Sequence, residues 1–325
     1  MQERQNMEPM PEISSEQNLS SFTPARSRAE RAGFPDWILV YGWIIIAFFL
    51  FQILASIFVF VGVMQRGAEL TDLLDPSTMV SQMDLLFLGN SVGQILVFGG
   101  LTLLMIRFVK RTAWADFIPM VTHPMVWKYS AIAAVLVLVG APAVWLMAWI
   151  NSLIPLPQLL TDLEQQQIQM IESFLKSDFI LGIAIFHIAL VPAICEEILY
   201  RGFALRLLQR TKTIWFSILV TGIIFGLYHL RLSQFIPLAT IGVFLGWITI
   251  RTGSIIPAVV AHFVNNASSV ILVKMMPDSP LSSSVPEMPP IWLALLSIIL
   301  VSALLYYLNM LTRDRGGEDV WKSTQ

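Results

Sequence analysis

The chain has 325 residues, of which 56% are hydrophobic and only 13% are charged. Soluble domains carry about 25% charged residues, so this composition excludes an ordinary soluble protein and, for most of the chain, an intrinsically disordered one. A single cysteine, Cys195, excludes a disulfide-stabilised scaffold, and a formal net charge of −2 gives no general attraction to nucleic acid. The composition therefore predicts an all-α, polytopic membrane protein that has the lipid bilayer as a partner.

The chain begins with a polar segment rich in Pro, Ser, Gln and Glu, and we expect residues 1–36 to form a disordered cytoplasmic tail. It does not have the pattern of a cleavable signal peptide, which needs a short apolar segment and a small-residue cleavage site. Eight runs without Asp, Glu, Lys or Arg follow, and about 20 apolar residues suffice to cross a bilayer. The runs cover residues 37–64, 85–106, 129–161, 179–195, 213–230, 232–250, 252–273 and 291–312.

Two of these runs differ from the helices that we expect. Pro155 and Pro157 should end the third helix early, because proline interrupts the helical hydrogen bonds. The fourth run stops at Glu196 and Glu197, but its apolar pattern resumes beyond them and predicts one helix from about 178 to 208 with charges embedded in it. The sequence thus predicts a bundle of about eight transmembrane helices over 37–312 and a short cytoplasmic tail over 313–325.

The distribution of Lys and Arg predicts the orientation of this bundle. With eight spans both termini lie on one side of the membrane, and that side then receives sixteen of the 20 basic residues. The other side holds only Arg66, Lys176, Arg231 and Lys274. Because basic residues concentrate on the cytoplasmic side, we expect both termini in the cytoplasm. The compact polar tails fit a multi-pass protein of a bacterial plasma membrane.

One pair of carboxylates lies inside a predicted span, where a charge costs about 3 kcal/mol or more and marks a candidate functional site. Glu196 and Glu197 adjoin, and Arg201 follows Glu197 by four residues, so these two can pair across one helical turn. Glu196 has no such partner, and an unpaired buried carboxylate suits general acid–base catalysis. A purely structural alternative is that both glutamates mark the cytoplasmic end of the span.

Two later spans carry further polar residues. His229 lies at the end of the fifth run, and His262 and Asn266 share one face of the seventh. Each alone could serve only packing or interhelical hydrogen bonding. Together with the carboxylates they supply a base, an assisting histidine and donors for an oxyanion, which suits hydrolysis by activated water. Glu196, His229 and His262 are also a familiar set of zinc ligands.

Depth in the membrane is a constraint on this site. On straight helices His229 would lie about 24 Å from the cytoplasmic end of its span, and His262 only about 13 Å from the end of its own. A shared site therefore requires helix tilt or a kink, for which Pro192 is the candidate. His187 would face away from Glu196 on the same helix, so we expect it to pack or to hydrogen-bond a neighbouring helix.

Ser91 suggests a different protease. It lies in Gly89-x-Ser91-x-Gly93, the pattern of a nucleophile elbow, and would be the nucleophile of a rhomboid-like serine protease. The segment is in the middle of a predicted helix, however, and its glycines also form a Gly-x-x-x-Gly motif, as do Gly242 and Gly246. We favour close helix packing as the function of both motifs.

The three polar groups resemble the signature of the CPBP family, the CAAX proteases and bacteriocin-processing enzymes, also called the Abi family. Its pattern is Glu-Glu-x-x-x-Arg, then Phe-x-x-x-His, then His-x-x-x-Asn. The matching residues are Glu196, Glu197 and Arg201 for the first motif, Phe225 and His229 for the second, and His262 and Asn266 for the third. The similarity covers a core over residues 178–273.

The resemblance implies an intramembrane endopeptidase of the type II CAAX prenyl protease kind. Its substrate would be a membrane-associated protein or peptide, such as a CAAX protein, a bacteriocin or a leader peptide. Glu196 would be the general base, His229 would assist it or bind the water, and His262 and Asn266 would hold the oxyanion. The Glu–Arg pair of the first motif would support these residues.

Mechanism and function both retain an alternative at this stage. Members of the family are treated either as metalloproteases or as metal-free glutamate-dependent proteases. Because the chain lacks the His-Glu-x-x-His helix of zinc proteases, we favour metal-free water activation over a divalent metal such as zinc held by Glu196, His229 and His262. The alternative function is a non-proteolytic protein of the same fold, either an immunity protein or a proton-coupled transporter.

Overall fold

The computed structural model describes residues 33–67, 81–109, 117–118, 124–176, 181–276 and 286–313, and the structural statements below concern these residues. They form helices and no β-strand, which confirms the all-α prediction. Nearly all of the two predicted polar tails, 1–36 and 313–325, lies outside the described residues.

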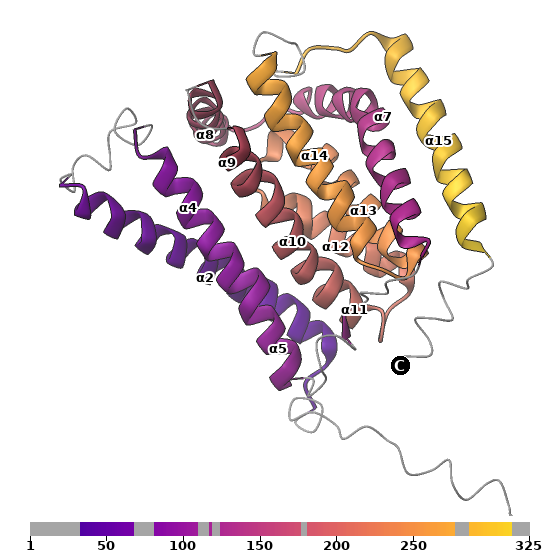
Figure 1. The fold of residues 1–325 in the computed structure, drawn as a ribbon, viewed down its shortest axis with the longest axis horizontal. Coiled ribbons are helices and arrows are strands. Elements are labelled where there is room, and N and C mark those ends of the chain that lie inside the picture. The colour runs from indigo at the N-terminus through magenta and orange to yellow at the C-terminus, as the bar shows by residue number, and fades with distance from the viewer. Residues whose placement is uncertain are drawn as a thin grey trace, which may run out of the picture.

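Seven helical stretches are long and apolar enough to cross a membrane (Figure 1). Three of them have unbroken α-helical bounds near the predicted runs: α2 (Asp36–Gln65), α7 (Val126–Ser152) and α15 (Ile291–Arg313). The helix at the seventh predicted run, α14 (Ile256–Met275), is also α-helical throughout and carries the third motif. α7 ends at Ser152, three residues before Pro155, as the prolines predict.

The remaining three stretches combine α-helix with other helical turns, and they correspond to the second, fourth and sixth predicted runs. The second is α4 (Met83–Gly93), the π-helix η2 (Gln94–Leu101) and α5 (Thr102–Val109). The fourth is α9 (Leu181–Ile185), η3 (Phe186–Leu190), α10 (Val191–Glu197), η4 (Ile198–Ala204) and α11 (Leu205–Leu208), where η3 and η4 are π-helical. The sixth is the 3₁₀ turn η5 (Leu232–Gln234) with α13 (Phe235–Thr252). π-Helical turns are rare and often mark functional sites.

The fifth predicted run forms a shorter helix, α12 (Ile214–Tyr228), of 15 residues. Its length of about 22 Å is less than the hydrocarbon thickness, so length alone does not make it a span. Thr213 caps its start, where the side-chain oxygen accepts the N–H of Phe216 at 3.3 Å. α13 ends on Gly253, whose φ of 66° is left-handed and favours glycine.

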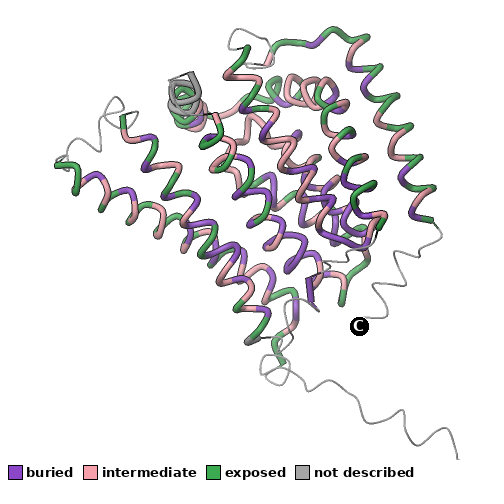
Figure 2. The backbone as a smooth tube through the Cα atoms, in the orientation of Figure 1, coloured by how far each residue is buried: buried purple, intermediate pink, exposed green. Residues whose placement is uncertain are grey.

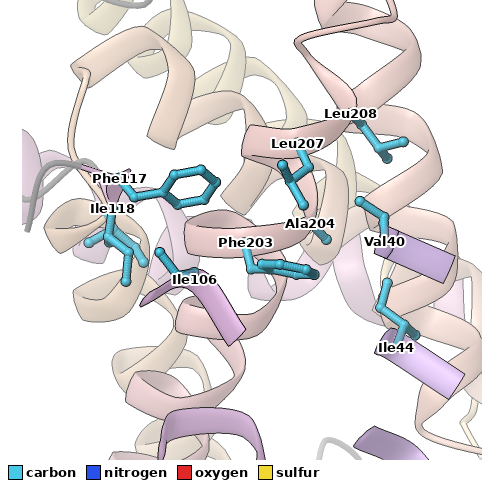
Figure 3. Packing of buried hydrophobic residues seen from close by; sticks show 10 residues of the cluster. Val40, Ile44, Ile106, Phe117, Ile118, Phe203, Ala204, Leu207 and Leu208 are labelled. Carbon is cyan, nitrogen blue, oxygen red and sulfur yellow. The ribbon is translucent and has the colours of Figure 1, made fainter. Parts of the chain in front are cut away.

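The start of α2 and the end of α15 lie at the same end of the helix bundle. Arg210, which follows α11, is 3.7 Å from Asp36 at the start of α2. Arg251 near the end of α13 donates to the carbonyl of Asn309 near the end of α15. One apolar cluster joins the start of α2, the end of α5 and α11 at this end (Figure 3). We call this end of the bundle the Asp36 end. Since α2 starts here and α15 ends here, α12 must also cross the bundle.

Helix α8 (Gln158–Lys176) is an element that the sequence analysis did not predict. It follows α7 at the opposite end of the bundle, and Figure 1 shows it almost along its axis while α10 and α14 run down the page. Glu164 is buried, whereas Leu159 and Leu163 are exposed. An amphipathic helix that lies across a bundle end is typical of the membrane interface.

Glycines bring two helix pairs into close contact. A Cβ on Gly89 would lie 3.0 Å from the Ala55 oxygen and one on Gly93 would lie 2.9 Å from Phe51, so this motif packs α4 against α2 as predicted. α12 and α13 cross equally closely, since a Cβ on Gly242 would lie 2.8 Å from the Gly222 oxygen. Gly246 has only ordinary contacts at 3.5 Å.

The fourth span is the centre of the bundle and carries the first motif. Residues 199–205 are all buried, and Figure 2 shows the burial concentrated on this part of the molecule. Figure 1 shows α10 between the α2–α4 pair on one side and α13 and α14 on the other. Charged side chains on this helix therefore face protein on both sides, where partners are available.

Candidate active site

Glu197 and Arg201 form the ion pair that their spacing predicts. Their side chains are fully buried, and Arg201 Nη1 donates to Glu197 Oε1 at 2.7 Å. Nη2 of the same guanidinium donates to the carbonyl of Gly242 at 2.8 Å, which the close crossing of α12 and α13 brings near. The guanidinium carbon also lies 4.9 Å from the centre of the Phe225 ring. Arg201 thus links three helices of the core at once.

His262 is held by the same carboxylate oxygen. Its Nδ1 lies 2.9 Å from Glu197 Oε1, so the ring donates this N–H to the carboxylate. A histidine with one nitrogen fixed in this way presents the other in a defined direction. Here Nε2 faces the neighbouring carboxylate and lies 4.0 Å from Glu196 Oε2.

Glu196 is the more exposed carboxylate of the pair and lacks the arginine partner that Glu197 has. Its side chain is 12% exposed, compared with 0% for Glu197. Its Oε2 is buried and has no hydrogen-bond partner among the described residues. The 4.0 Å to His262 Nε2 is too long for a direct hydrogen bond, and a small oxygen-containing group can contact both atoms. The two adjacent glutamates therefore differ as predicted in their pairing: Glu197 binds Arg201 and Glu196 does not, although each has one buried oxygen without a partner among the described residues.

His229 approaches the same centre from α12. Its Nδ1 donates to the carbonyl of Phe225 at 2.7 Å, which leaves Nε2 as the nitrogen available to a ligand. The Phe225 ring lies 4.8 Å from the His229 ring and 5.6 Å from the His262 ring, measured between centroids. One phenylalanine thus contacts both histidines, so the expected difference in depth does not keep them apart.

Asn266 contacts the helix that carries the carboxylates. Its Nδ2 lies 3.3 Å from the carbonyl oxygen of Ile188 and donates to it. Pro192, four residues after Ile188, has no N–H to offer this oxygen in an α-helix, so the carbonyl is free to accept the side chain. Asn265 Nδ2 donates to Asn266 Oδ1 at 3.1 Å. The amide of Asn266 is therefore fixed one helical turn from His262.

All three motifs meet in the interior of one bundle, and comparison with known proteins identifies the segment that carries them. Residues 178–268 match the family described as type II CAAX prenyl endopeptidase Rce1-like. This agrees with the CPBP resemblance of the three motifs and includes every residue of them. No curated protein and no solved structure matches the chain.

The Rce1-like segment gives the chain its broad class. The match supports a protease of the CAAX type, and seven long apolar helices make the chain a multi-pass membrane protein. The segment extends from the fourth span to α14, so the first three spans and α15 lie outside it.

A metal site requires several ligands that converge on one point. Among the described residues no three His, Cys, Asp or Glu side chains are arranged to hold a metal ion. His262 Nδ1 is committed to Glu197, and His229 Nδ1 is committed to a backbone carbonyl. Both contacts leave Nε2 of each histidine open, as in metal-binding histidines, so what argues against a metal is the lack of three converging donors among the described residues, and no step below uses one.

Ser91 and His187 form a hydrogen bond that links α4 to η3. Ser91 Oγ lies 2.7 Å from His187 Nδ1, and the serine is 2% exposed. This fulfils the expectation that His187 bonds a neighbouring helix. It is also the contact that a serine protease would need, although Gly89 and Gly93 pack against α2 on either side of the serine. The histidines of the second and third motifs lie elsewhere, His229 at the C-terminal end of α12 and His262 on α14.

Two tyrosines near Glu196 were missed in the sequence analysis. The hydroxyl groups of Tyr200 and Tyr228 are buried and have no hydrogen-bond partner among the described residues. Their rings meet edge to face at 5.8 Å, and Tyr200 lies four residues after Glu196, one helical turn away. Both lie inside motifs, since Tyr200 precedes Arg201 and Tyr228 precedes His229, and this was the available signal.

Proposed function

We propose that the chain is an intramembrane endopeptidase in which Glu196 activates the water that attacks a peptide bond. One observation carries the proposal: a buried carboxylate oxygen of Glu196 has no partner among the described residues and faces His262 Nε2 at 4.0 Å. In an apolar interior such an oxygen is costly unless a ligand uses it. A water molecule that contacts both atoms is suitably placed for proton abstraction.

The reaction uses the side chains already described. Glu196 removes a proton from the water as its oxygen bonds to the peptide carbonyl carbon, and the carbonyl oxygen becomes an oxyanion. Asn266 stabilises this oxyanion through its side-chain N–H, and His262 does so through Nε2–H in its doubly protonated form, since its Nδ1–H is donated to Glu197; His229 orients the water. When the carbon–nitrogen bond breaks, Glu196 returns the proton to the departing amine. Glu197 and Arg201 do not react but hold His262 in position.

The substrate in this proposal is a membrane-associated protein or peptide. A site between membrane-spanning helices suits a lipidated CAAX-type segment, a bacteriocin precursor or a leader peptide. The proposed mechanism uses no metal, since no three His, Cys, Asp or Glu side chains among the described residues are arranged to hold one. The metalloprotease mechanism is the alternative, and a metal requirement would support it.

We further propose that the Asp36 end faces the cytoplasm, with both termini on that side. The Asp36 end holds most of the described basic side chains: Arg107, Lys128, Arg206, Arg210, Lys212, Arg251 and Arg313. The opposite end holds Arg66, Arg231 and Lys274. Basic residues are retained on the cytoplasmic side. Single cysteines introduced at Lys212 and at Leu163, in a Cys195→Ala background, should label from opposite sides, and labelling from the same side would contradict this topology.

The direct test is proteolysis by the purified protein in liposomes. The probes are a farnesylated CAAX peptide and an unmodified membrane-embedded peptide, and cleavage is followed by mass spectrometry. We expect Glu196→Gln to abolish cleavage of the accepted probe while the protein keeps its thermal unfolding temperature. Full activity of Glu196→Gln would refute the assigned base. Proton-dependent uptake without cleavage of any probe would favour the transporter alternative.

A serine protease is the second candidate, and the hydrogen bond between Ser91 and His187 is the observation that favours it. A serine nucleophile and a water nucleophile predict opposite results for two variants. If Glu196 is the base, Ser91→Ala keeps cleavage and Glu196→Gln loses it. Loss of cleavage in Ser91→Ala alone would establish the serine mechanism.

A further inference from the structure

The turn that follows His229 has a backbone conformation that the local sequence does not favour. Leu230 has a φ of 52°, and it is the one described non-glycine residue with a positive φ. Such a conformation costs free energy for a branched side chain, so it persists only where the surroundings impose it. The Leu230 side chain is 59% exposed and offers little packing to stabilise the turn. The restraint must therefore act on the backbone on either side.

Glu164 of α8 supplies two of these restraints. Its Oε1 accepts the N–H of Leu232 at 2.7 Å, and its Oε2 accepts the N–H of Ser233 at 3.2 Å. These two N–H groups begin η5, and the first N–H groups of a helix have no partner within it. A carboxylate at this position is favourable for the helix dipole as well. Glu164 is only 7% exposed, although it lies on an amphipathic helix at the end of the bundle.

Asn151 at the end of α7 supplies two more. Its Nδ2 donates to the carbonyl of Leu232 at 2.9 Å, and its Oδ1 accepts the N–H of Ile236 at 2.7 Å. Asn151 is 3% exposed, so water does not compete for these bonds. Two buried side chains from two other helices thus make four hydrogen bonds to the five residues 232–236.

We propose that Glu164 and Asn151 are positioning residues that fix His229 in the active site through the turn at Leu230. This inference rests on the proposed function, in which His229 orients the attacking water. His229 is the C-cap residue of α12, and the hydrogen bond that its ring makes among the described residues is to the carbonyl of Phe225 in the turn before it. The direction in which the chain leaves His229 is therefore set by the restrained turn. A displacement of about 1 Å in such a group can cost 100-fold in rate.

Charge supports the same arrangement. Arg231 lies in the turn itself, where burial lowers the pKa of its guanidinium and the Glu164 carboxylate acts to raise it. The Glu164 carboxylate is thus the acidic partner of the turn as well as its hydrogen-bond acceptor. Replacement of Glu164 removes two backbone bonds and one favourable charge interaction together, whereas Asn151 contributes backbone bonds alone.

The test compares Glu164→Ala with Asp162→Ala in the liposome cleavage assay. Asp162 lies on the same helix, is exposed and binds only Gln158, at 2.8 Å, among the contacts described for it, so it is a matched control. We expect Glu164→Ala to lower kcat by about 10- to 100-fold with KM changed less than about threefold, and Asp162→Ala to change neither by more than about twofold. Glu164→Gln keeps an acceptor oxygen and should recover part of kcat. Asn151→Asp keeps the bond to Ile236 and should show an intermediate loss.

A double mutant separates positioning from general stability. If Glu164 acts through His229, Glu164→Ala should cost nothing further in a His229→Ala background. Additive losses, or an unchanged kcat in Glu164→Gln and Asn151→Asp, would overturn the inference. If His229→Ala itself retains full activity while Glu196→Gln is inactive, the role of His229 fails and the inference fails with it. If Glu196→Gln is active, the proposed function fails first, and the two failures are distinct.

Discussion

Glu197 Oε1 accepts the Nδ1–H of His262 at 2.9 Å, although 65 residues separate them in the chain. The same oxygen accepts Arg201 Nη1 at 2.7 Å, so one atom receives a donor from its own helix and another from α14. The second Glu197 oxygen has no partner among the described residues. The free-energy cost of burying these charges is therefore offset mainly at a single oxygen, which makes this contact sensitive to change.

The first prediction concerns the stability of this pair. Glu197→Gln should lower the free energy of unfolding by about 3–5 kcal/mol, because it leaves the Arg201 charge buried without its counter-ion. The exposed pair of Arg66 and Asp84 is the control, with side chains 42% and 48% exposed. Asp84→Asn should cost only about 0–1 kcal/mol. Denaturant unfolding in detergent micelles measures both, and equal losses would contradict the buried-pair interpretation.

The second prediction compares alanine substitutions at two glycines, Gly222 of α12 and Gly246 of α13. A Cβ on Gly222 would lie 2.5 Å from Val243 Cγ2 and 2.6 Å from the Val243 nitrogen, so Gly222→Ala must move α12 away from α13. We expect a loss of about 1–3 kcal/mol in stability and a large loss of cleavage, because the Gly242 carbonyl would leave Arg201. Gly246→Ala meets its nearest atom at 3.5 Å and should be tolerated. Equal tolerance of both variants would contradict the close crossing.

The third prediction concerns the Tyr228 hydroxyl near Glu196. Its removal in Tyr228→Phe should lower kcat by about 10-fold, since it deprives the charged site of a donor. The same change should raise stability slightly, because a buried hydroxyl without a partner among the described residues is removed. Tyr129 gives the opposite expectation: its hydroxyl donates to the Leu311 carbonyl at 3.4 Å, far along the bundle, so Tyr129→Phe should leave kcat unchanged. Equal kcat values for the two variants would exclude Tyr228 from the site.

The sequence alone predicts the helical bundle well, because the bilayer imposes a simple rule on length and charge. Each uncharged run became a helix close to its predicted bounds, and α7 ends where Pro155 requires. α8 was missed because its apolar residues are spaced for only one face of an interfacial helix. Four of the five residues 165–169 are also glutamines, which interrupt the apolar pattern. α12 was predicted as an ordinary span, but it forms only 15 helical residues before His229.

The contacts of the site depend on how the helices are placed against one another. The i,i+4 spacing predicts the pairing of Glu197 with Arg201, because both lie on one helix. The bond from His262 to Glu197 and the bond from Asn266 to Ile188 depend on the register of α14 against α10, which no local pattern encodes. The same is true of Glu164 and Asn151, which act on a turn 68 and 81 residues away. The family motifs identify residues of the site but not these supports.

The last prediction distinguishes metal-free catalysis from metal catalysis. Among the described residues no three His, Cys, Asp or Glu side chains converge on one point, although Glu196 Oε2 and His262 Nε2 lie 4.0 Å apart and both histidines keep Nε2 open. We expect cleavage to survive prolonged dialysis against EDTA and 1,10-phenanthroline, because zinc needs three or four ligands at about 2.0–2.3 Å from one centre. Elemental analysis of the dialysed protein must show that metal is absent, which provides the control. Loss of cleavage that zinc restores would assign Glu196, His229 and His262 to a metal site formed by rearrangement of these side chains.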